Sequence, residues 1–114
     1  MSLGLIYNDK RHIFDETETE PPLLIYPMFE KTGLVRHGFS TRLGGVSEGE
    51  FTSLNLSFDR GDKKEAVMEN FRRIAGSLGV CCEDMGLSRQ THTTNVRIVT
   101  EKDRGKGIVR ERDY

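Results

Sequence analysis

Three histidines occur in this 114-residue sequence. His92 stands out: it lies in the stretch RQTHTTNVRIV, with Gln90 and Thr94 two residues away on either side. In a strand these three side chains would share one face, and a histidine there could be a metal ligand. A catalytic zinc needs three protein ligands, and no second candidate lies near His92 in the sequence. The alternative is an ordinary strand histidine that is hydrogen-bonded to a neighbour.

The segment STRLGGVSEGEFTSLNL holds the densest set of candidate binding groups. Gly44 and Gly45 permit positive φ and close backbone approach, so N–H groups could converge on an anion beside Arg42. The Arg42 guanidinium can add a bidentate contact to phosphate or carboxylate. Spacing alone favours the alternative, a glycine-rich hairpin with a solvated arginine. Asn55 either satisfies the local loop backbone or, as the minority interpretation, contacts a ligand.

The remaining histidines and the cysteines point to structure more than to chemistry. His37 lies inside an apolar segment, which is typical of a structural histidine, and nothing around His12 suggests a role. Cys81 and Cys82 are adjacent and have no other cysteine to pair with, which predicts reduced thiols and a cytoplasmic protein. For one of them we expect a buried packing role.

The elements that position these groups are predicted to be short strands around one long helix. The sequence predicts a helix over 62–79, with Asp62 as its cap, Glu65 completing a capping box and Gly79 as its stop. Strands are predicted at 23–26, 34–41, 87–92 and 95–100, with Leu34 and Phe39 as core candidates and a helical turn at 27–30 between the first two. Residues 42–62 read as a structured loop with a short extended piece around SLNL.

Composition limits the class of protein. With 17 basic and 18 acidic residues, the net charge of −1 gives no global field for nucleic acid or an anionic membrane. The apolar stretches are too short to span a bilayer. We interpret residues 1–114 as a single partial α+β domain, with residues 1–3 as an expression scar. An uncovered sheet face then predicts self-association or pairing with a missing C-terminal half.

The order of the motifs resembles one family. HGFSTRLGGVSEGEFTSLNL, then GD, a helix with ENFRRIAGSLG, and QTHTTNV are similar to the YfiH, or laccase-domain, multicopper polyphenol oxidoreductase family, which has the mammalian relative FAMIN. The resemblance runs from about His37 to Val99. It implies the N-terminal part of a fold with alpha/beta/beta/alpha layers and mixed sheets. Thr93 departs from the glycine that usually follows the Q-x-H histidine.

The resemblance also implies a site and a reaction. The family holds zinc between two histidines and a cysteine, and His92 matches the first histidine, while the other two ligands come from motifs this sequence lacks. The implied activity is purine nucleoside phosphorylase with adenosine deaminase activity, acting on adenosine, inosine and methylthioadenosine. Arg42 is then the candidate phosphate clamp and Asn55 a candidate ribose or base contact, with purine nucleosides and phosphate as partners.

Other functions stay open at this point. Copper is the alternative metal, and polyphenol oxidation or amidase-type editing of peptidoglycan precursors are alternatives within the family. Copper oxidases need several clustered histidines, and the three here are scattered. A non-catalytic nucleotide-binding or association module is the alternative of a different class. We expect the 114-residue chain alone to be inactive, because one ligand cannot hold a catalytic ion.

Overall fold

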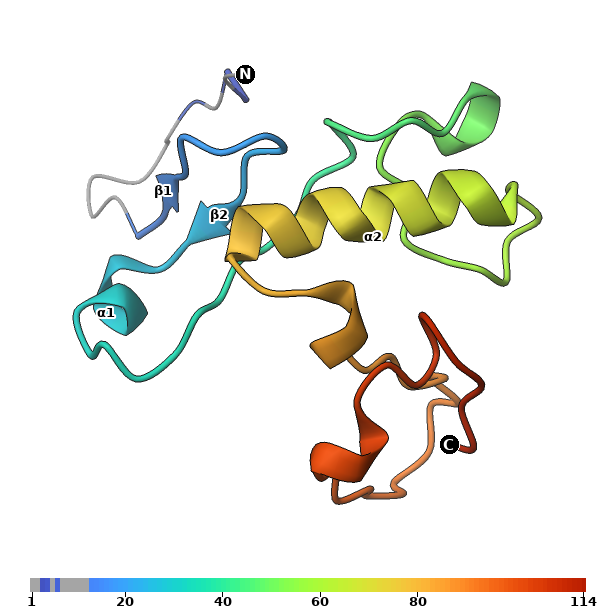
Figure 1. Ribbon diagram of the computed structural model, residues 1–114. Helices are drawn as coiled ribbons and strands as arrows, with labels where there is room; N and C mark the ends of the chain where they lie inside the picture. Colours follow the sequence, from blue (N-terminus) through green and yellow to red (C-terminus); the bar gives the residue numbers. More distant parts are fainter. Residues whose placement is uncertain (1–2, 5, 7–12) are drawn as a thin grey trace. The chain divides into compact units, whose positions relative to one another are not determined.

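The computed structural model describes residues 3–4, 6 and 13–114, and His12 lies outside them (Figure 1). The chain divides into two compact units, one ending at Gly79 and the other comprising Val80–Tyr114. The assignment of residues 1–114 to one partial domain stays a prediction, as does the expression scar.

The first unit is built on helix α2, Lys64–Leu78, which the sequence predicted (Figure 1). One stripe of the helix is buried, formed by Val67, Asn70, Phe71, Ile74 and Ala75. Gly79 ends the helix with φ of 73°, a left-handed conformation that glycine adopts without the Cβ clash of other residues. The predicted C-terminal stop is therefore confirmed.

The predicted N-terminal cap of α2 is wrong. Lys63 occupies the cap position, and no side chain caps the helix there. The Asp62 carboxylate accepts hydrogen bonds from the Lys63 N–H at 2.8 Å and, through its other oxygen, from Ser47 Oγ at 2.5 Å. Asp62 thus holds the preceding loop instead of the first turn, and Glu65 completes no capping box.

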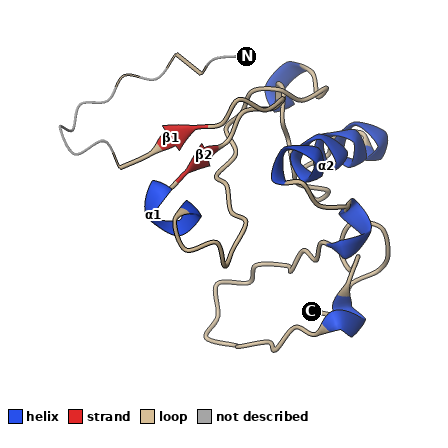
Figure 2. Cartoon of the chain, turned by 60° about the vertical axis from the view of Figure 1, so that its left-hand side comes forward, coloured by secondary structure: helices blue, strands red, loops and turns tan. Residues whose placement is uncertain are grey.

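The first unit also contains a small antiparallel sheet. Strand β1, Asp15–Glu16, pairs with β2, Leu24–Ile25, and Phe39 adds an isolated bridge to Leu24 (Figure 2). The predicted strand at 23–26 and the helical turn α1, Pro27–Glu30, are both confirmed.

The predicted strand over 34–41 is wrong except at that bridge. Leu34 is 85% exposed and Phe39 is 70% exposed, so neither is a core residue. Successive side chains of a strand point to opposite faces, and Leu23 takes the buried face, at 2% exposure. Phe39 lies opposite Leu24 and shares its face, because directly opposed residues point the same way.

The core of the first unit joins the loop to the helix. Leu23, Leu54 and Ile74 form its buried centre, with Leu56 and Leu78 packed against it. Both leucines of SLNL therefore point inward, although the described chain forms a short 3-10 turn at Gly49–Phe51 and no strand at SLNL.

The second unit consists mostly of loops (Figure 2). Its helical turns are both 3-10, at Cys82–Asp84 and Glu101–Asp103. Cys82 is 6% exposed and Cys81 is exposed, which confirms a packing role for one cysteine. The strands predicted at 87–92 and 95–100 do not form in this described unit, where Val96 is 91% exposed. Alternation alone cannot make a strand when no neighbouring strand offers a hydrogen-bonding edge.

Asp103 organises the turn that closes this unit. Its carboxylate is 6% exposed and accepts from Lys106 Nζ at 2.8 Å, from the Thr100 N–H at 2.8 Å and from Arg97 Nη2 at 3.2 Å. These contacts, that of Lys106 foremost, hold the pKa of Asp103 well below its usual range.

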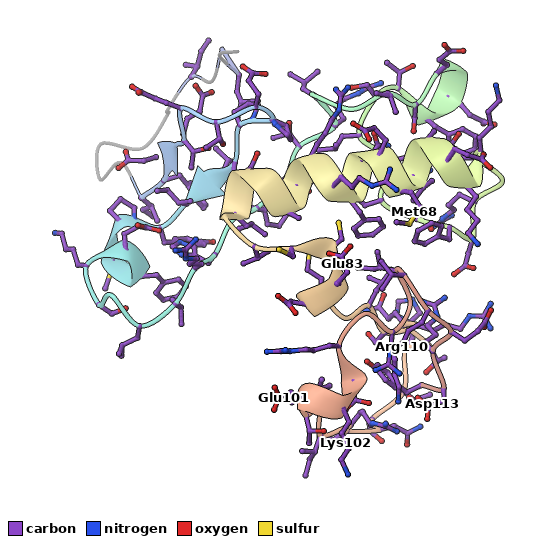
Figure 3. The ribbon with its side chains drawn as sticks, in the orientation of Figure 1. Met68, Glu83, Glu101, Lys102, Arg110 and Asp113 are labelled. Carbon is purple, nitrogen blue, oxygen red and sulfur yellow. The ribbon has the colours of Figure 1, made fainter. Side chains whose placement is uncertain are left out.

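The side chain of Arg110 also binds the backbone of this turn. Its Nε donates to the Arg104 carbonyl at 2.7 Å, and its guanidinium also donates to the Lys102 carbonyl. The side chains of Arg110 and Lys102 are labelled in Figure 3. In the described part of the chain, no helix has the length and apolar character needed to cross a membrane.

Candidate functional site

The structure brings two of the three predicted site residues together. Arg42 and Asn55 line one pocket of the first unit, and its other lining residues are Glu50, Phe51, Thr52 and Leu54. Two donors of the Arg42 guanidinium, Nε and Nη2, point to the Thr52 carbonyl at 3.2 and 3.0 Å. Arg42 is exposed, so its guanidinium is within reach of solvent and of a soluble anion.

The side chain of Asn55 satisfies the local loop, as one of the two interpretations required. Its Oδ1 accepts from the Ser57 N–H at 3.1 Å, while Nδ2 donates to Asp62 Oδ2 at 3.2 Å and to the Ser57 carbonyl at 3.3 Å. The orientation of the amide is therefore fixed. A contact between Asn55 and a ligand stays a prediction.

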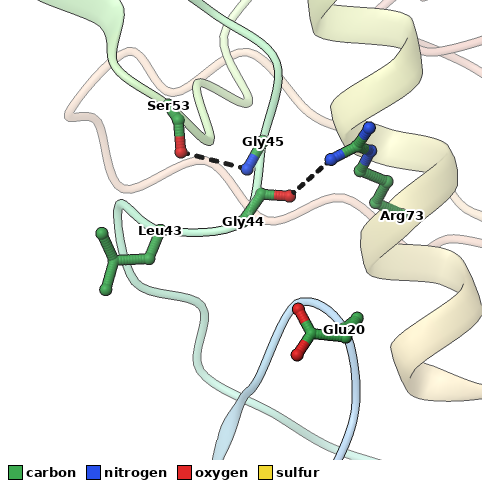
Figure 4. A pocket seen from close by; sticks show the side chains of 6 residues that line it. All are labelled: Glu20, Leu43, Gly44, Gly45, Ser53 and Arg73. Carbon is green, nitrogen blue, oxygen red and sulfur yellow. Dashed lines mark hydrogen bonds between the residues drawn. The ribbon is translucent and has the colours of Figure 1, made fainter. Parts of the chain in front are cut away.

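The glycine pair serves close packing. A Cβ at Gly44, where φ is 97°, would lie 2.3 Å from Pro21 Cβ, and one at Gly45 would lie 2.1 Å from the Ser53 carbonyl oxygen. A pocket beside the pair is lined by Glu20, Leu43 and Arg73 as well, and Arg73 Nη1 donates to the Gly44 carbonyl at 3.1 Å (Figure 4).

The backbone N–H groups after Gly44 are occupied within the protein. Gly45 donates to Ser53 Oγ at 3.1 Å, Val46 to Asn70 Oδ1 at 2.8 Å and Ser47 to the Ser53 carbonyl at 2.9 Å. These N–H groups bind the loop to itself and to α2, so they do not converge on an anion, which spacing alone already disfavoured.

Asn70 is a residue of this site that sequence reasoning missed. It is 0% exposed on the buried stripe of α2, between Val67 and Ile74. Its Nδ2 donates to Ser47 Oγ at 2.9 Å and to the Asn55 carbonyl at 2.8 Å. The signal that could have found it is its position, because a polar residue three after one core residue and four before another must lie on the apolar face.

Asp62 joins the side chains of Ser47 and Asn55. Its Oδ2 accepts from both Ser47 Oγ and Asn55 Nδ2. The hydrogen bond from Ser47 is the largest of several that lower the pKa of Asp62, which keeps this carboxylate ionised.

His92, the third predicted site residue, lies in the second unit. It is exposed, in the loop over 88–99, and its φ of 54° is left-handed, which is uncommon outside glycine. It lines a pocket with Arg89, Gln90, Arg97 and Tyr114, and the Arg97 guanidinium lies 4.6 Å from the Tyr114 ring centre. His92 is thus a loop residue and not the strand residue that the alternation predicted.

The described residues do not by themselves form a metal site. No group of three His, Cys, Asp or Glu side chains among them is arranged to hold a metal ion. His92 therefore lacks the co-ligands that zinc or copper chemistry requires within the described part of this chain.

A family model described as multi-copper polyphenol oxidoreductase laccase matches residues 36–113, and the chain belongs to this family. The match includes Arg42, Asn55 and His92. The chain is 40% identical over 76 residues to the purine nucleoside phosphorylase YlmD of Geobacillus stearothermophilus, an alignment that covers 61% of this chain and 26% of the relative. It is 44% identical over 62 residues to a purine nucleoside phosphorylase of Deinococcus radiodurans, covering 54% of this chain and 24% of that one.

Solved structures support the same relationship. The crystal structure of YlmD from Geobacillus stearothermophilus matches with a TM-score of 0.74 and 34% identity, over 83% of this chain and 34% of that one. Bacillus licheniformis hypothetical protein YfiH matches with a TM-score of 0.71 and 30% identity, over 81% and 33%. The chain thus has the α+β fold of one portion of a YfiH-like domain, and it spans about a quarter of the length of the curated relatives it matches.

Proposed function

We propose that the protein to which this chain contributes is a purine nucleoside phosphorylase. One observation carries the proposal: the matched segment 36–113 contains all three candidate site residues, and the curated relatives are named purine nucleoside phosphorylases. The proposed partners are a purine nucleoside and phosphate, with adenosine, inosine and methylthioadenosine as substrates.

Arg42 is proposed as the phosphate clamp. Its bonds to the Thr52 carbonyl use Nε and Nη2, which orients the guanidinium and leaves Nη1 for an incoming anion. A preoriented cation stabilises the negative charge of the attacking phosphate without reorganising. The exposure of Arg42 gives the phosphate access.

Asn55 is proposed as a ribose or base contact. Its amide is held by Ser57 and Asp62, so the remaining lone pair of Oδ1 is the group available to a hydroxyl of the nucleoside. The pocket shared with Arg42 then places a polar acceptor and a cation within one cavity.

His92 is proposed as one ligand of a catalytic zinc, with copper as the alternative metal. Since the described residues supply no other ligands to it, we propose that the rest of the set comes from parts of the protein that the structure does not describe. When bound, zinc lowers the pKa of its water towards neutrality, which suits the adenosine deaminase activity that we also propose. Cys81 and Cys82 are both thiols, which supports the proposed cytoplasmic location.

The test is phosphate-dependent release of hypoxanthine from inosine, with zinc content measured on the same samples. It is run on the 114-residue chain, on the protein with the natural sequence extended past Tyr114, and on that protein with His92→Ala. Of these three proteins, we expect only the extended protein without the substitution to cleave inosine and to bind about one zinc. Turnover that requires neither zinc nor His92 would show that the metal assignment is wrong.

A non-catalytic module is the second candidate. It is favoured by one observation, that this chain spans 26% of the YlmD relative and 34% of the YlmD structure. In that case the 114-residue chain binds nucleotide or associates with a partner, without turnover and without stoichiometric metal.

A further inference from the structure

We propose that Asn70 is a positioning residue for the pocket of Arg42 and Asn55. The inference rests on the proposed function and deepens it, because it names a residue outside the pocket that sets the pocket's geometry. Asn70 lies on α2, whereas both pocket residues lie in the loop over 42–62.

The amide of Asn70 joins two arms of that loop. Its Oδ1 accepts the Val46 N–H at 2.8 Å on the arm that follows Arg42. Its Nδ2 donates to Ser47 Oγ at 2.9 Å on the same arm and to the Asn55 carbonyl at 2.8 Å on the other. One planar group therefore fixes the spacing between the arms that carry the two pocket residues.

Asp62 extends this link to the Asn55 side chain. Ser47 Oγ donates to Asp62 Oδ2, and so does Asn55 Nδ2, so a closed ring of hydrogen bonds runs through Asn70, Ser47, Asp62 and Asn55. Asn55 is tied by its backbone to Asn70 and by its side chain to Asp62. Its amide cannot rotate without breaking the ring.

The loop is fitted closely to this group. A Cβ at Gly45 would lie 2.6 Å from Asn70 Oδ1, so the backbone at that point has room only for glycine. The link to Arg42 runs through the other arm of the loop, where the Arg42 carbonyl accepts the N–H groups of Ser53 and Leu54, both at 2.9 Å. Shifting either arm would therefore move both walls of the pocket.

The choice of asparagine points to more than core packing. An apolar side chain at this buried position would fill the space but leave the Val46 N–H and the Asn55 carbonyl without the partners that Asn70 supplies. A buried amide is favourable only when its groups are bonded, and a fully bonded polar network selects one arrangement of the chain. The arrangement selected here is that of the pocket.

The test uses the isosteric variant Asn70→Asp, which keeps the acceptor for Val46 and removes both Nδ2 donors. Gly76→Asp is the matched control, because it adds the same charge to an exposed position of α2 where a Cβ meets nothing within 4 Å. NMR spectra of the 114-residue chain follow the Arg42 Nε–H and the Asn55 side-chain NH2 during a titration with inorganic phosphate. In the extended enzyme, KM for phosphate and kcat are measured separately.

We expect Asn70→Asp to shift both reporter signals in the absence of phosphate. It should also raise KM for phosphate about tenfold, while kcat changes less. Gly76→Asp should remain within twofold of the unchanged protein. Unchanged reporter signals and phosphate affinity in Asn70→Asp would overturn the proposal. If that variant does not fold, Asn70→Ser is measured in the same way, and failure of both to fold would assign Asn70 to stability alone.

A different result would contradict the proposed function. A lack of phosphate binding and of inosine cleavage in the unsubstituted extended protein would exclude the phosphorylase. The reporter signals of Arg42 and Asn55 would still show whether Asn70 sets their geometry.

Discussion

The backbone carbonyl of Arg42 accepts the N–H of Leu54 at 2.9 Å, and the Leu54 side chain is one of the three residues at the centre of the core. A candidate binding residue at the surface is thus one hydrogen bond away from the packing that stabilises the fold. Stability and site geometry are coupled at this point. A substitution in the core should therefore change the geometry of the site at Arg42.

Leu54→Ala should lower the free energy of unfolding by about 2–4 kcal/mol, because it removes buried methyl groups and leaves a cavity. Leu54 is 6% exposed, whereas Leu34 is 85% exposed, so Leu34→Ala is the matched control and should change stability by less than about 0.5 kcal/mol. Urea unfolding followed by circular dichroism measures both. Equal losses in the two variants would contradict the observed core.

Arg42→Ala should raise KM for phosphate in the extended enzyme by about tenfold or more, because a charge-assisted contact is worth about 1.5–3 kcal/mol. Stability should change little, since Arg42 is exposed. Arg72→Ala is the control: Arg72 is an exposed arginine on α2 that pairs with Glu69 at 3.5 Å. If both variants have the KM for phosphate of the unsubstituted enzyme, phosphate binds at another site.

The helix could be predicted from sequence and most of the strands could not, for a physical reason. Helical hydrogen bonds are local, so the spacing of Val67, Phe71 and Ile74 was sufficient to predict α2. A strand needs a neighbouring strand, and alternation in 95–100 says nothing about whether the chain provides one. Val96 and Ile98 are accordingly exposed, at 91% and 81%.

The candidate site was predicted in part. The glycine-rich segment drew attention to Arg42 and Asn55, which share a pocket in the structure, while their roles stay predictions. Asn70 was missed because its role depends on partners 15 to 24 residues away in the sequence, among them the Asn55 carbonyl and the Val46 N–H. Asp62 was assigned to helix capping from local spacing, whereas the folded chain turns its carboxylate towards Ser47.

Asp103 should make stability depend on pH. Its pKa in the folded protein is depressed, chiefly by Lys106, so its contribution is fully present above the unfolded value near 3.8 and is lost as pH falls below that value towards the folded one. Unfolding free energies measured between neutral pH and about pH 3, across the unfolded carboxyl range, should therefore fall less steeply for Asp103→Asn than for the unchanged chain. Glu101→Gln, on the same turn with a side chain 79% exposed, should keep the original slope. Parallel curves for Asp103→Asn and the unchanged chain would contradict this role.

Substitution by alanine should change stability in opposite directions at Gly79, which ends α2, and at Gly76, which lies inside it. Gly79 has φ of 73°, and a Cβ there would lie 2.1 Å from Arg36 Nη1, a group that donates to the Gly79 carbonyl at 2.9 Å. Gly79→Ala should cost about 1–2 kcal/mol of stability, because it forces a left-handed alanine and displaces Arg36 from the end of the helix. Gly76 is inside the helix with open space around its Cβ position, so Gly76→Ala should stabilise by up to about 1 kcal/mol. Thermal unfolding of the two variants side by side gives the comparison, and a stabilising Gly79→Ala would mean that the helix does not end at that residue.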